Sequence, residues 1–150
     1  MKQETVGDLE LSLGYVLKQV HASMRTAMDE ALRSLDLTVP QYACLELLGQ
    51  DPGLSNSELA RRAFITRQTM NLIVRRLQER GLLTRPDQAP RGRALPTELT
   101  RDGRTLLREA SVAVRAVERR LFSPLSPERQ RRLRQDLAAC VAAVAESPDA

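Results

Sequence analysis

The chain has 150 residues, a formal net charge of +4 and 42% hydrophobic residues, which suits one domain or one compact unit with a projecting arm. It has no Trp, two Tyr and two Phe, so its core must come from Leu, Val, Ala and Met, and this favours packed helices over a β-sandwich. One His and two Cys exclude a multi-histidine or four-cysteine metal site within one chain. So few aromatic residues also exclude a base-stacking surface of the RRM or OB kind.

The charge is unevenly distributed. Residues 1–60 carry 4 basic and 9 acidic side chains, whereas residues 61–104 carry 11 arginines and 4 acids. Arginine binds phosphate or guanine through two parallel hydrogen bonds, so this basic segment indicates a nucleic-acid-binding surface. A generally arginine-rich composition is the alternative explanation, but it does not explain why Glu79 is the only acid between Arg61 and Pro86.

The expected location is the cytoplasm. No stretch approaches the roughly 18 consecutive apolar residues of a membrane span, and residues 1–4 lack the apolar run of a signal peptide. Cys44 and Cys140 lie within apolar helical patterns, so both thiols are expected to be reduced.

Three amphipathic helices are expected outside the basic segment. Apolar residues recur every three or four positions from Leu9 to Leu35, which predicts one long helix. Thr100 is the predicted cap of another, and the segment 123–128 separates it from a last helix with Ser126 as its cap. The three expected faces are Leu9, Leu13, Val16, Val20, Met24, Ala27, Ala31 and Leu35; Leu106, Ala110, Val114, Val117 and Leu121; and Leu133, Leu137, Val141 and Val144.

A further helix is predicted after Thr38, a plausible N-cap, with Pro40 in its first turn. Its expected apolar face is Tyr42, Leu45 and Leu48, and it stops at the turn residues 49–53.

Residues 55–81 are predicted to form a helix-turn-helix. Ser55 and Glu58 have the spacing of a capping box, which opens a helix of about two turns. Thr66 caps a longer second helix, and Gly81 is placed to end it. A short helix, a tight turn and a longer helix are the layout of this DNA-binding unit.

A two-stranded ribbon is predicted after Gly81. The strand candidates are residues 82–85 and 95–99, and Pro96 restricts the second to an edge position. The turn residues 86–92 join them and place Arg91 and Arg93 at the tip.

The second helix of this unit has two distinct faces. Met70, Ile73, Val74 and Leu77 recur at core spacing, and the other side carries Arg67, Gln68, Asn71, Arg75 and Gln78. Gln, Asn and Arg can bond two atoms of one base edge, and a helix fits the major groove. The base-contact candidates are therefore Arg67, Gln68, Asn71 and Arg75, the alternative being an ordinary solvated helix face. The candidates for contact with the DNA backbone are Ser55, Arg61, Arg62, Thr66, Thr69, Arg91 and Arg93.

Four short motifs resemble those of MarR-type winged helix-turn-helix regulators. Residues 54–60 are similar to their L-x-x-x-E-L-A, and residues 66–82 to their recognition helix with its L-E-x-x-G-L exit. Residues 99–104 resemble the L-T-x-x-G-R that follows the wing, and residues 37–42 resemble L-T-x-x-Q-Y. The chain departs from the family at Leu72, where the family often has Arg, and at Arg75, where it often has Asp. The wing sequence 90–93 lacks the family's usual Asp. Leu72 could contact a thymine methyl group or simply pack.

The resemblance implies a mainly α fold with a small β-wing. Residues 38–100 would form the winged DNA-binding domain, and residues 1–37 and 101–150 a helical dimerisation domain. Such a homodimer places two recognition helices about 34–36 Å apart on a palindromic operator in double-stranded DNA. It typically represses promoters and is released by a small-molecule ligand held between the dimer helices and the winged domain. Tyr15 and His21 are weak candidates for that pocket.

No cofactor, metal or catalytic activity is expected, because the single His and the absence of a nucleophile motif argue against an enzyme. Two alternatives remain open. One is a redox-sensing regulator of the same fold that uses Cys44, and the other is a helical interaction module whose arginine face binds an acidic partner.

Overall fold

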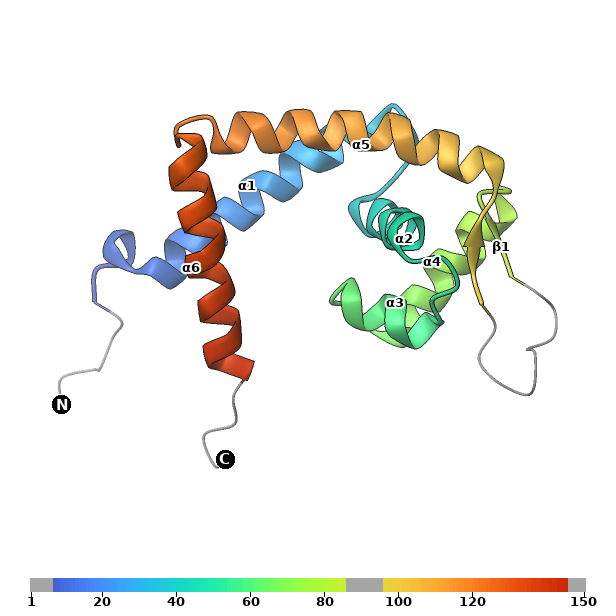
Figure 1. Cartoon of the computed structure of the whole chain (residues 1–150), viewed down its shortest axis with the longest axis horizontal. Helices are drawn as coiled ribbons and strands as arrows, with labels where there is room; N and C mark the ends of the chain where they lie inside the picture. Colours follow the sequence, from blue (N-terminus) through green and yellow to red (C-terminus); the bar gives the residue numbers. More distant parts are fainter. Residues whose placement is uncertain (1–6, 86–95, 146–150) are drawn as a thin grey trace. The chain divides into compact units, whose positions relative to one another are not determined.

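The computed structural model describes residues 7–85 and 96–145, so the predicted wing tip with Arg91 and Arg93 lies outside the described residues (Figure 1). The elements are η1 (Leu9–Leu11), α1 (Leu13–Arg33), α2 (Val39–Gln50), α3 (Asn56–Arg62), α4 (Arg67–Glu79), β1 (Leu83–Thr84), β2 (Glu98–Leu99), α5 (Arg101–Phe122) and α6 (Pro127–Ala145). The chain divides into two compact units, Met1–Val117 and Glu118–Ala150. The prediction of a mainly helical fold with a small antiparallel sheet is confirmed.

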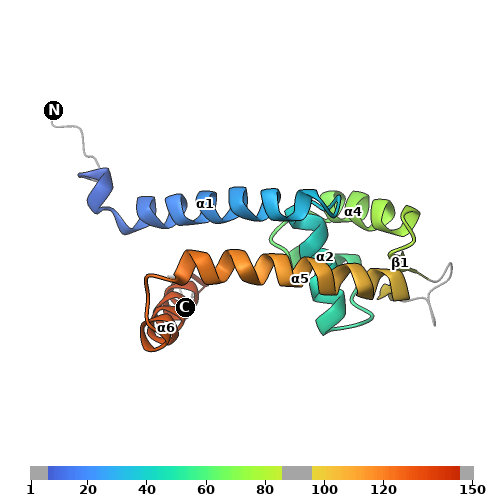
Figure 2. The same ribbon diagram turned by 90° about the horizontal axis from the view of Figure 1, so that it is seen from above.

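The prediction of one continuous N-terminal helix is wrong. Ser12 separates η1 from α1 and caps α1 by accepting a hydrogen bond of 3.4 Å from the backbone N–H of Tyr15. The buried residues of α1 are Met28 and Leu32, which do not belong to the predicted apolar stripe. Only the C-terminal end of α1 reaches α2 (Figure 2), so packing against α2 decides which face of α1 is buried.

Local capping fixes the starts of the next three helices as predicted. Thr38 and Gln41 form a capping box at α2, and Ser55 and Glu58 form one at α3. Thr66 caps α4 by accepting from the N–H of Thr69 at 3.1 Å. These bonds satisfy N–H groups that have no partner within the helix.

Gly81 ends α4, also as predicted. Its φ of +75° is the left-handed conformation that glycine adopts without steric penalty. The N–H of Leu82 then donates to the carbonyl of Leu77 at 3.0 Å, which closes a Schellman turn. The turn directs the chain from α4 straight into β1.

A single buried core joins α1, α2, α3, α4, both strands and the middle of α5. Its members are Met28, Leu32, Leu37, Cys44, Leu45, Leu48, Leu59, Ala60, Met70, Val74, Leu77, Leu82, Leu83, Leu99, Ala110 and Val114. Tyr42, predicted on the buried face of α2, is only partly buried, and Cys44 is fully buried. The core residues predicted for α4 and for the middle of α5 are confirmed at Met70, Val74 and Ala110.

The base of the wing is tied to the start of α5. β1 and β2 pair antiparallel, with Leu83 opposite Leu99. The Thr100 hydroxyl donates to the carbonyl of Gly81 at 2.6 Å and accepts from the N–H of Gly103 at 3.0 Å. A Cβ atom at Gly103 would collide with the carbonyl oxygen of Leu82. The Thr100–Gly103 pair therefore lets α5 pack directly on the backbone that enters β1.

The C-terminal helices begin and end close to the predicted residues. α5 ends at Phe122, and α6 begins at Pro127 after the N-cap Ser126, whose hydroxyl accepts from the N–H of Arg129 at 3.3 Å. No residue of the described α6 is buried, and Leu137, Val141 and Val144 of its apolar stripe are exposed. Within residues 7–85 and 96–145, no helix combines the length and the apolar character needed to cross a membrane.

Gly103→Ala is expected to lower the free energy of unfolding by about 1–3 kcal/mol, because the added methyl group forces α5 away from Leu82. Gly14→Ala is the matched control: Gly14 also lies in a helix, but its nearest neighbour to an added Cβ is the Ser12 hydroxyl at 3.9 Å. The Gly14→Ala substitution should raise the free energy of unfolding by about 0.5–1 kcal/mol. Urea unfolding followed by circular dichroism measures both, and equal effects of the two substitutions would contradict the packing argument.

Candidate nucleic-acid interface

A tight turn joins α3 to α4. The N–H of Ile65 donates to the carbonyl of Ala60 at 3.0 Å, and the N–H of Phe64 donates to the carbonyl of Arg61 at 3.3 Å, which is the Schellman pattern. Phe64 occupies the left-handed position with φ of +61°, and its side chain is 93% exposed. Glycine usually fills this position, so the sequence did not mark Phe64 as the turn residue.

The structure places all four predicted base-contact residues on the exposed side of α4. Met70, Val74 and Leu77 are buried beneath the helix, whereas Arg67, Gln68, Asn71 and Arg75 are exposed. Gln68 and Arg75 are seven residues apart and lie on the ridge opposite the core. Arg67 and Asn71 are four residues apart and lie on one flank of that ridge. α4 therefore presents a broad polar surface of side chains suited to base edges.

Asn71 is held by a polar chain that reaches the base of the wing. The amide nitrogen of Asn56, at the start of α3, donates to the Asn71 amide oxygen, and the Arg85 guanidinium donates to the Asn56 amide oxygen. Arg85 also donates through Nε to the hydroxyl of the fully buried Thr97 at 3.2 Å. Sequence reasoning missed Asn56, Arg85 and Thr97, because only the fold brings them together.

Arg85 also lies close enough to Cys44 for their charges to interact. Burial raises the pKa of the Cys44 thiol to about 12, and the Arg85 guanidinium opposes part of that rise. Burial likewise lowers the pKa of Arg85 from its ordinary value. Cys44 is therefore a neutral thiol at neutral pH, enclosed in the core beneath the wing.

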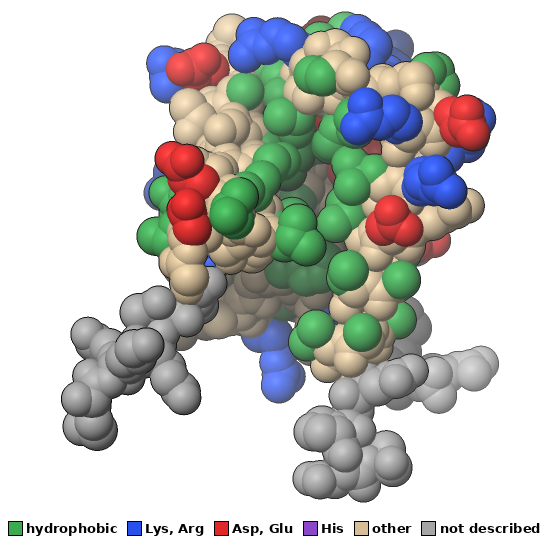
Figure 3. All heavy atoms as spheres, turned by 90° about the vertical axis from the view of Figure 1, so that its left-hand side faces the viewer, with side chains coloured by type: hydrophobic (Ala, Val, Ile, Leu, Met, Phe, Trp, Pro, Cys, Tyr) green, Lys and Arg blue, Asp and Glu red, His purple; other side chains and the backbone are tan. Residues whose placement is uncertain are grey.

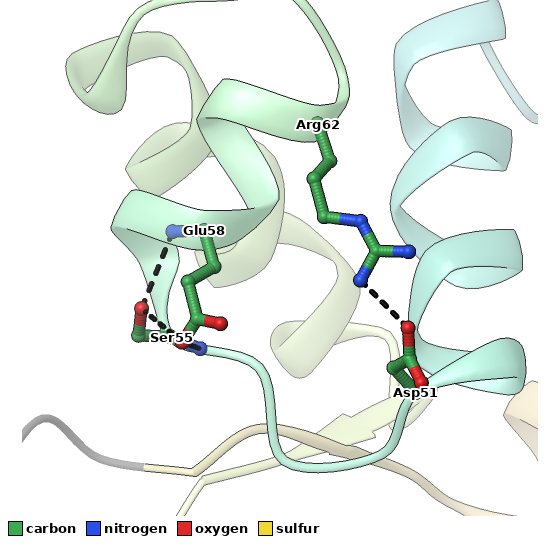
Figure 4. A network of polar contacts seen from close by, with 4 residues as sticks. All are labelled: Asp51, Ser55, Glu58 and Arg62. Carbon is green, nitrogen blue, oxygen red and sulfur yellow. Dashed lines mark hydrogen bonds and ion pairs between the residues drawn. The ribbon is translucent and has the colours of Figure 1, made fainter.

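The hydroxyls of Ser55, Thr66 and Thr69, which are predicted to contact the DNA backbone, differ in whether their proton is already donated within the protein. The Ser55 hydroxyl donates to the Glu58 carboxylate at 3.0 Å (Figure 4), and the Thr66 hydroxyl donates to that of Thr69 at 2.9 Å. A phosphate oxygen only accepts, so a hydroxyl needs a free proton to bind it. The Thr69 hydroxyl proton has no acceptor among residues 7–85 and 96–145, which leaves Thr69 the best placed of the three.

The two arginines at the end of α3, Arg61 and Arg62, also differ in whether they already have an ion-pair partner. Arg62 forms an ion pair of 2.7 Å with Asp51 (Figure 4), which holds α3 against the end of α2. Arg61 is exposed and has no ion-pair partner within the described residues. The Arg61 side chain is therefore available to bind a phosphate, whereas the Arg62 side chain is already paired with Asp51.

Two adjoining hollows lie between α2 and residues 104–115 of α5. Their volumes are about 380 and 370 Å³, and Gly49, Leu107 and Arg108 line both. Their other lining residues are Glu46, Leu48, Gln50, Pro52, Glu98, Leu99, Arg104, Ser111, Val112 and Arg115. The weak pocket candidates Tyr15 and His21 lie exposed on α1 and line neither hollow.

Comparison with known proteins gives a consistent family. The MarR family model matches residues 35–94. The HTH-type transcriptional repressor Rv2887 of Mycobacterium tuberculosis is 42% identical over 125 residues, which are 83% of this chain and 90% of the relative.

Two solved structures of that Mycobacterium tuberculosis protein are similar to this chain. Its complex with DNA has a TM-score of 0.73 at 40% identity and covers 86% of this chain and 97% of that chain. Its complex with salicylic acid has a TM-score of 0.71 at 41% identity and covers 86% of this chain and 96% of that chain. The sequence motifs, the fold and these relatives agree, and the chain belongs to the MarR family of transcriptional regulators.

Proposed function

We propose that this chain acts as a homodimeric, sequence-specific DNA-binding repressor that a small aromatic acid releases from its operator. The observation that carries the proposal is the exposed polar face of α4 in a helix-turn-helix whose relative has been solved with DNA. The function is binding rather than catalysis. Because its target is double-stranded DNA, the cytoplasm is its expected place of action.

We assign base reading to Arg67, Gln68, Asn71 and Arg75, and backbone contact to Arg61 and Thr69. The exposure of the first four and the free donors of the last two support this division. Ser55 and Thr66 remain candidates for backbone contact through their place at helix N-termini, where N–H groups and the helix dipole attract phosphate. Arg91 and Arg93 remain predicted wing contacts.

Uncovered apolar residues support the homodimer with residues 1–37 and 101–150 as its helical part. Leu13 is 88% exposed on α1 and Val144 is 87% exposed on α6, and hydrophobic side chains are open on the face drawn in Figure 3. Other exposed members are Leu9, Leu11, Tyr15, Val16, Leu17, Val20, Leu137 and Val141. Each of the two compact units therefore exposes large apolar side chains of its own, and exposed apolar surface of this kind marks a protein interface that a two-fold partner would bury.

The hollows between α2 and α5 support the effector part of the proposal. Arg108 lines both hollows, and Arg104 and Arg115 line one each. A guanidinium binds a carboxylate through paired hydrogen bonds, while Leu107 and Val112 offer apolar contact. This chemistry fits an aromatic acid, the class to which the salicylic acid bound by the Mycobacterium tuberculosis relative belongs.

The DNA proposal is tested on an operator that the purified protein selects from a random pool, with binding followed by fluorescence anisotropy. Gln68→Ala should weaken binding to this operator by about 1–3 kcal/mol and reduce its preference over random duplex. Arg61→Ala should weaken both duplexes alike and reduce the salt slope by about 0.9.

An equal loss on operator and random duplex for Gln68→Ala would remove its base-reading role. Selection of no sequence, with equally tight binding to heparin, would instead favour the acidic-partner alternative.

The effector proposal is tested by adding salicylate to the complex with the selected operator. Salicylate should release the DNA, and Arg108→Gln should raise the concentration for half-release about 10-fold or more, because a charged hydrogen bond contributes about 1.5–3 kcal/mol. Arg101→Gln is the matched control, since Arg101 lies on the same helix but lines neither hollow. An identical response of the two variants would place the effector elsewhere.

The burial of Cys44 favours ligand release over release by thiol oxidation. The thiolate is the species that reacts with oxidants, and the Cys44 pKa of about 12 keeps the thiol neutral at neutral pH. Its full burial also keeps oxidants away from the sulfur.

In a Cys140→Ser variant, Cys44 is the only thiol. At pH 8 its reaction with a thiol reagent should be on the order of 1000-fold slower in the native protein than in guanidinium, as the thiolate fraction implies. A native rate equal to the unfolded rate would revive the redox alternative.

Because the unfolded thiol ionises at lower pH than the folded one, the wild type should lose stability relative to Cys44→Ala as pH rises from about 9 to about 12.

A further inference from the structure

Leu72 is an apolar side chain in the middle of the polar face of α4. It is 62% exposed and does not belong to the core or to the apolar residues packed against it. The neighbouring Ile73, by contrast, is packed against the core. The sequence left open whether Leu72 packs or faces outward, and the structure places it outward.

Leu72 occupies the line of α4 that lies farthest from the core. It comes four residues after Gln68 and three before Arg75, so these three side chains lie one above another along the helix. Met70, Val74 and Leu77 are buried on the opposite side. When α4 enters a major groove with its core face outward, this ridge faces the base edges.

The major groove offers one apolar group to such a residue. Base edges there carry hydrogen-bond donors and acceptors, and the thymine 5-methyl group is their only hydrocarbon substituent. Gln68 and Arg75 can bond the polar atoms above and below, whereas Leu72 can form no hydrogen bond. A cytosine or guanine opposite Leu72 would lose water from its polar edge without a replacement bond.

We propose that Leu72 is a specificity-determining residue that contacts the 5-methyl group of a thymine in each half-site. This inference rests on the proposed function and deepens it. Phe64, the other strongly exposed apolar side chain of the helix-turn-helix, lies in the turn before α4 and not on this ridge.

The test replaces each thymine of the selected operator with deoxyuridine, one at a time. Uracil keeps every hydrogen-bonding atom of thymine and lacks only the methyl group, so the change isolates the proposed contact. One substitution should raise Kd about 4-fold for the wild type, as expected for losing one buried methyl group, and the symmetric pair about 15-fold.

Variants at Leu72, tested on the same thymine and uracil operators, show whether the methyl dependence comes from this residue. Leu72→Ala should bind thymine and uracil operators equally at that position, because its side chain no longer reaches the methyl group. Leu72→Met keeps an apolar side chain of similar length and should retain most of the discrimination. Circular dichroism should be unchanged in both variants, since Leu72 lies outside the core.

The proposal is overturned if no thymine position shows methyl dependence in the wild type, if the dependence persists in Leu72→Ala, or if the selected half-site contains no thymine on either strand. In each of these cases the wild type still binds its operator, so the proposed function stands. Failure of the wild type to bind any DNA would overturn both.

Discussion

The burial of one face of α4 is the constraint on which the rest of this structure depends. Met70 and Leu77 are fully buried, and Val74 between them is nearly so. Because these three buried side chains fix the rotation of α4 about its axis, the opposite face of the helix must point to solvent. The polar residues of α4, and the apolar Leu72 that lies among them, are exposed as a consequence of this packing.

A second layer of polar contacts ties the wing base to that helix. The chain of hydrogen bonds from Thr97, just before β2, through Arg85, just after β1, reaches Asn56 in α3 and Asn71 in α4. Thr97 is fully buried, Asn56 is half-buried and Asn71 is exposed, so the network is anchored in the core and ends at the proposed DNA surface. A residue positioned by such a network loses less side-chain entropy on binding than a free one.

α5 links the proposed DNA surface to the proposed effector site. Its first turn packs on the backbone before β1 through Thr100 and Gly103, and its middle contributes Ala110 and Val114 to the core. The same helix supplies Arg108 to both hollows. Two sites are coupled when a ligand at one has different affinities for two conformations that also differ at the other. A ligand in the hollows with different affinities for two positions of α5 would therefore shift the wing and α4 together.

The sequence alone determined the features that depend on near neighbours. The caps Thr38, Ser55 and Thr66, the stop at Gly81 and the two faces of α4 follow from hydrogen bonds and side-chain periods within a few residues. Only tertiary structure decided the rest, because those outcomes depend on residues far apart in the chain. The burial of Met28 and Leu32, beside the only partly buried Met24 and Leu35 of the predicted stripe, requires α2. The neutral thiol of Cys44 requires the enclosing core, and the hydrogen bonds that position Asn71 require Arg85 at the wing base. Periodicity shows which residues of a helix share a face, but only the packing partners decide how deeply that face is buried.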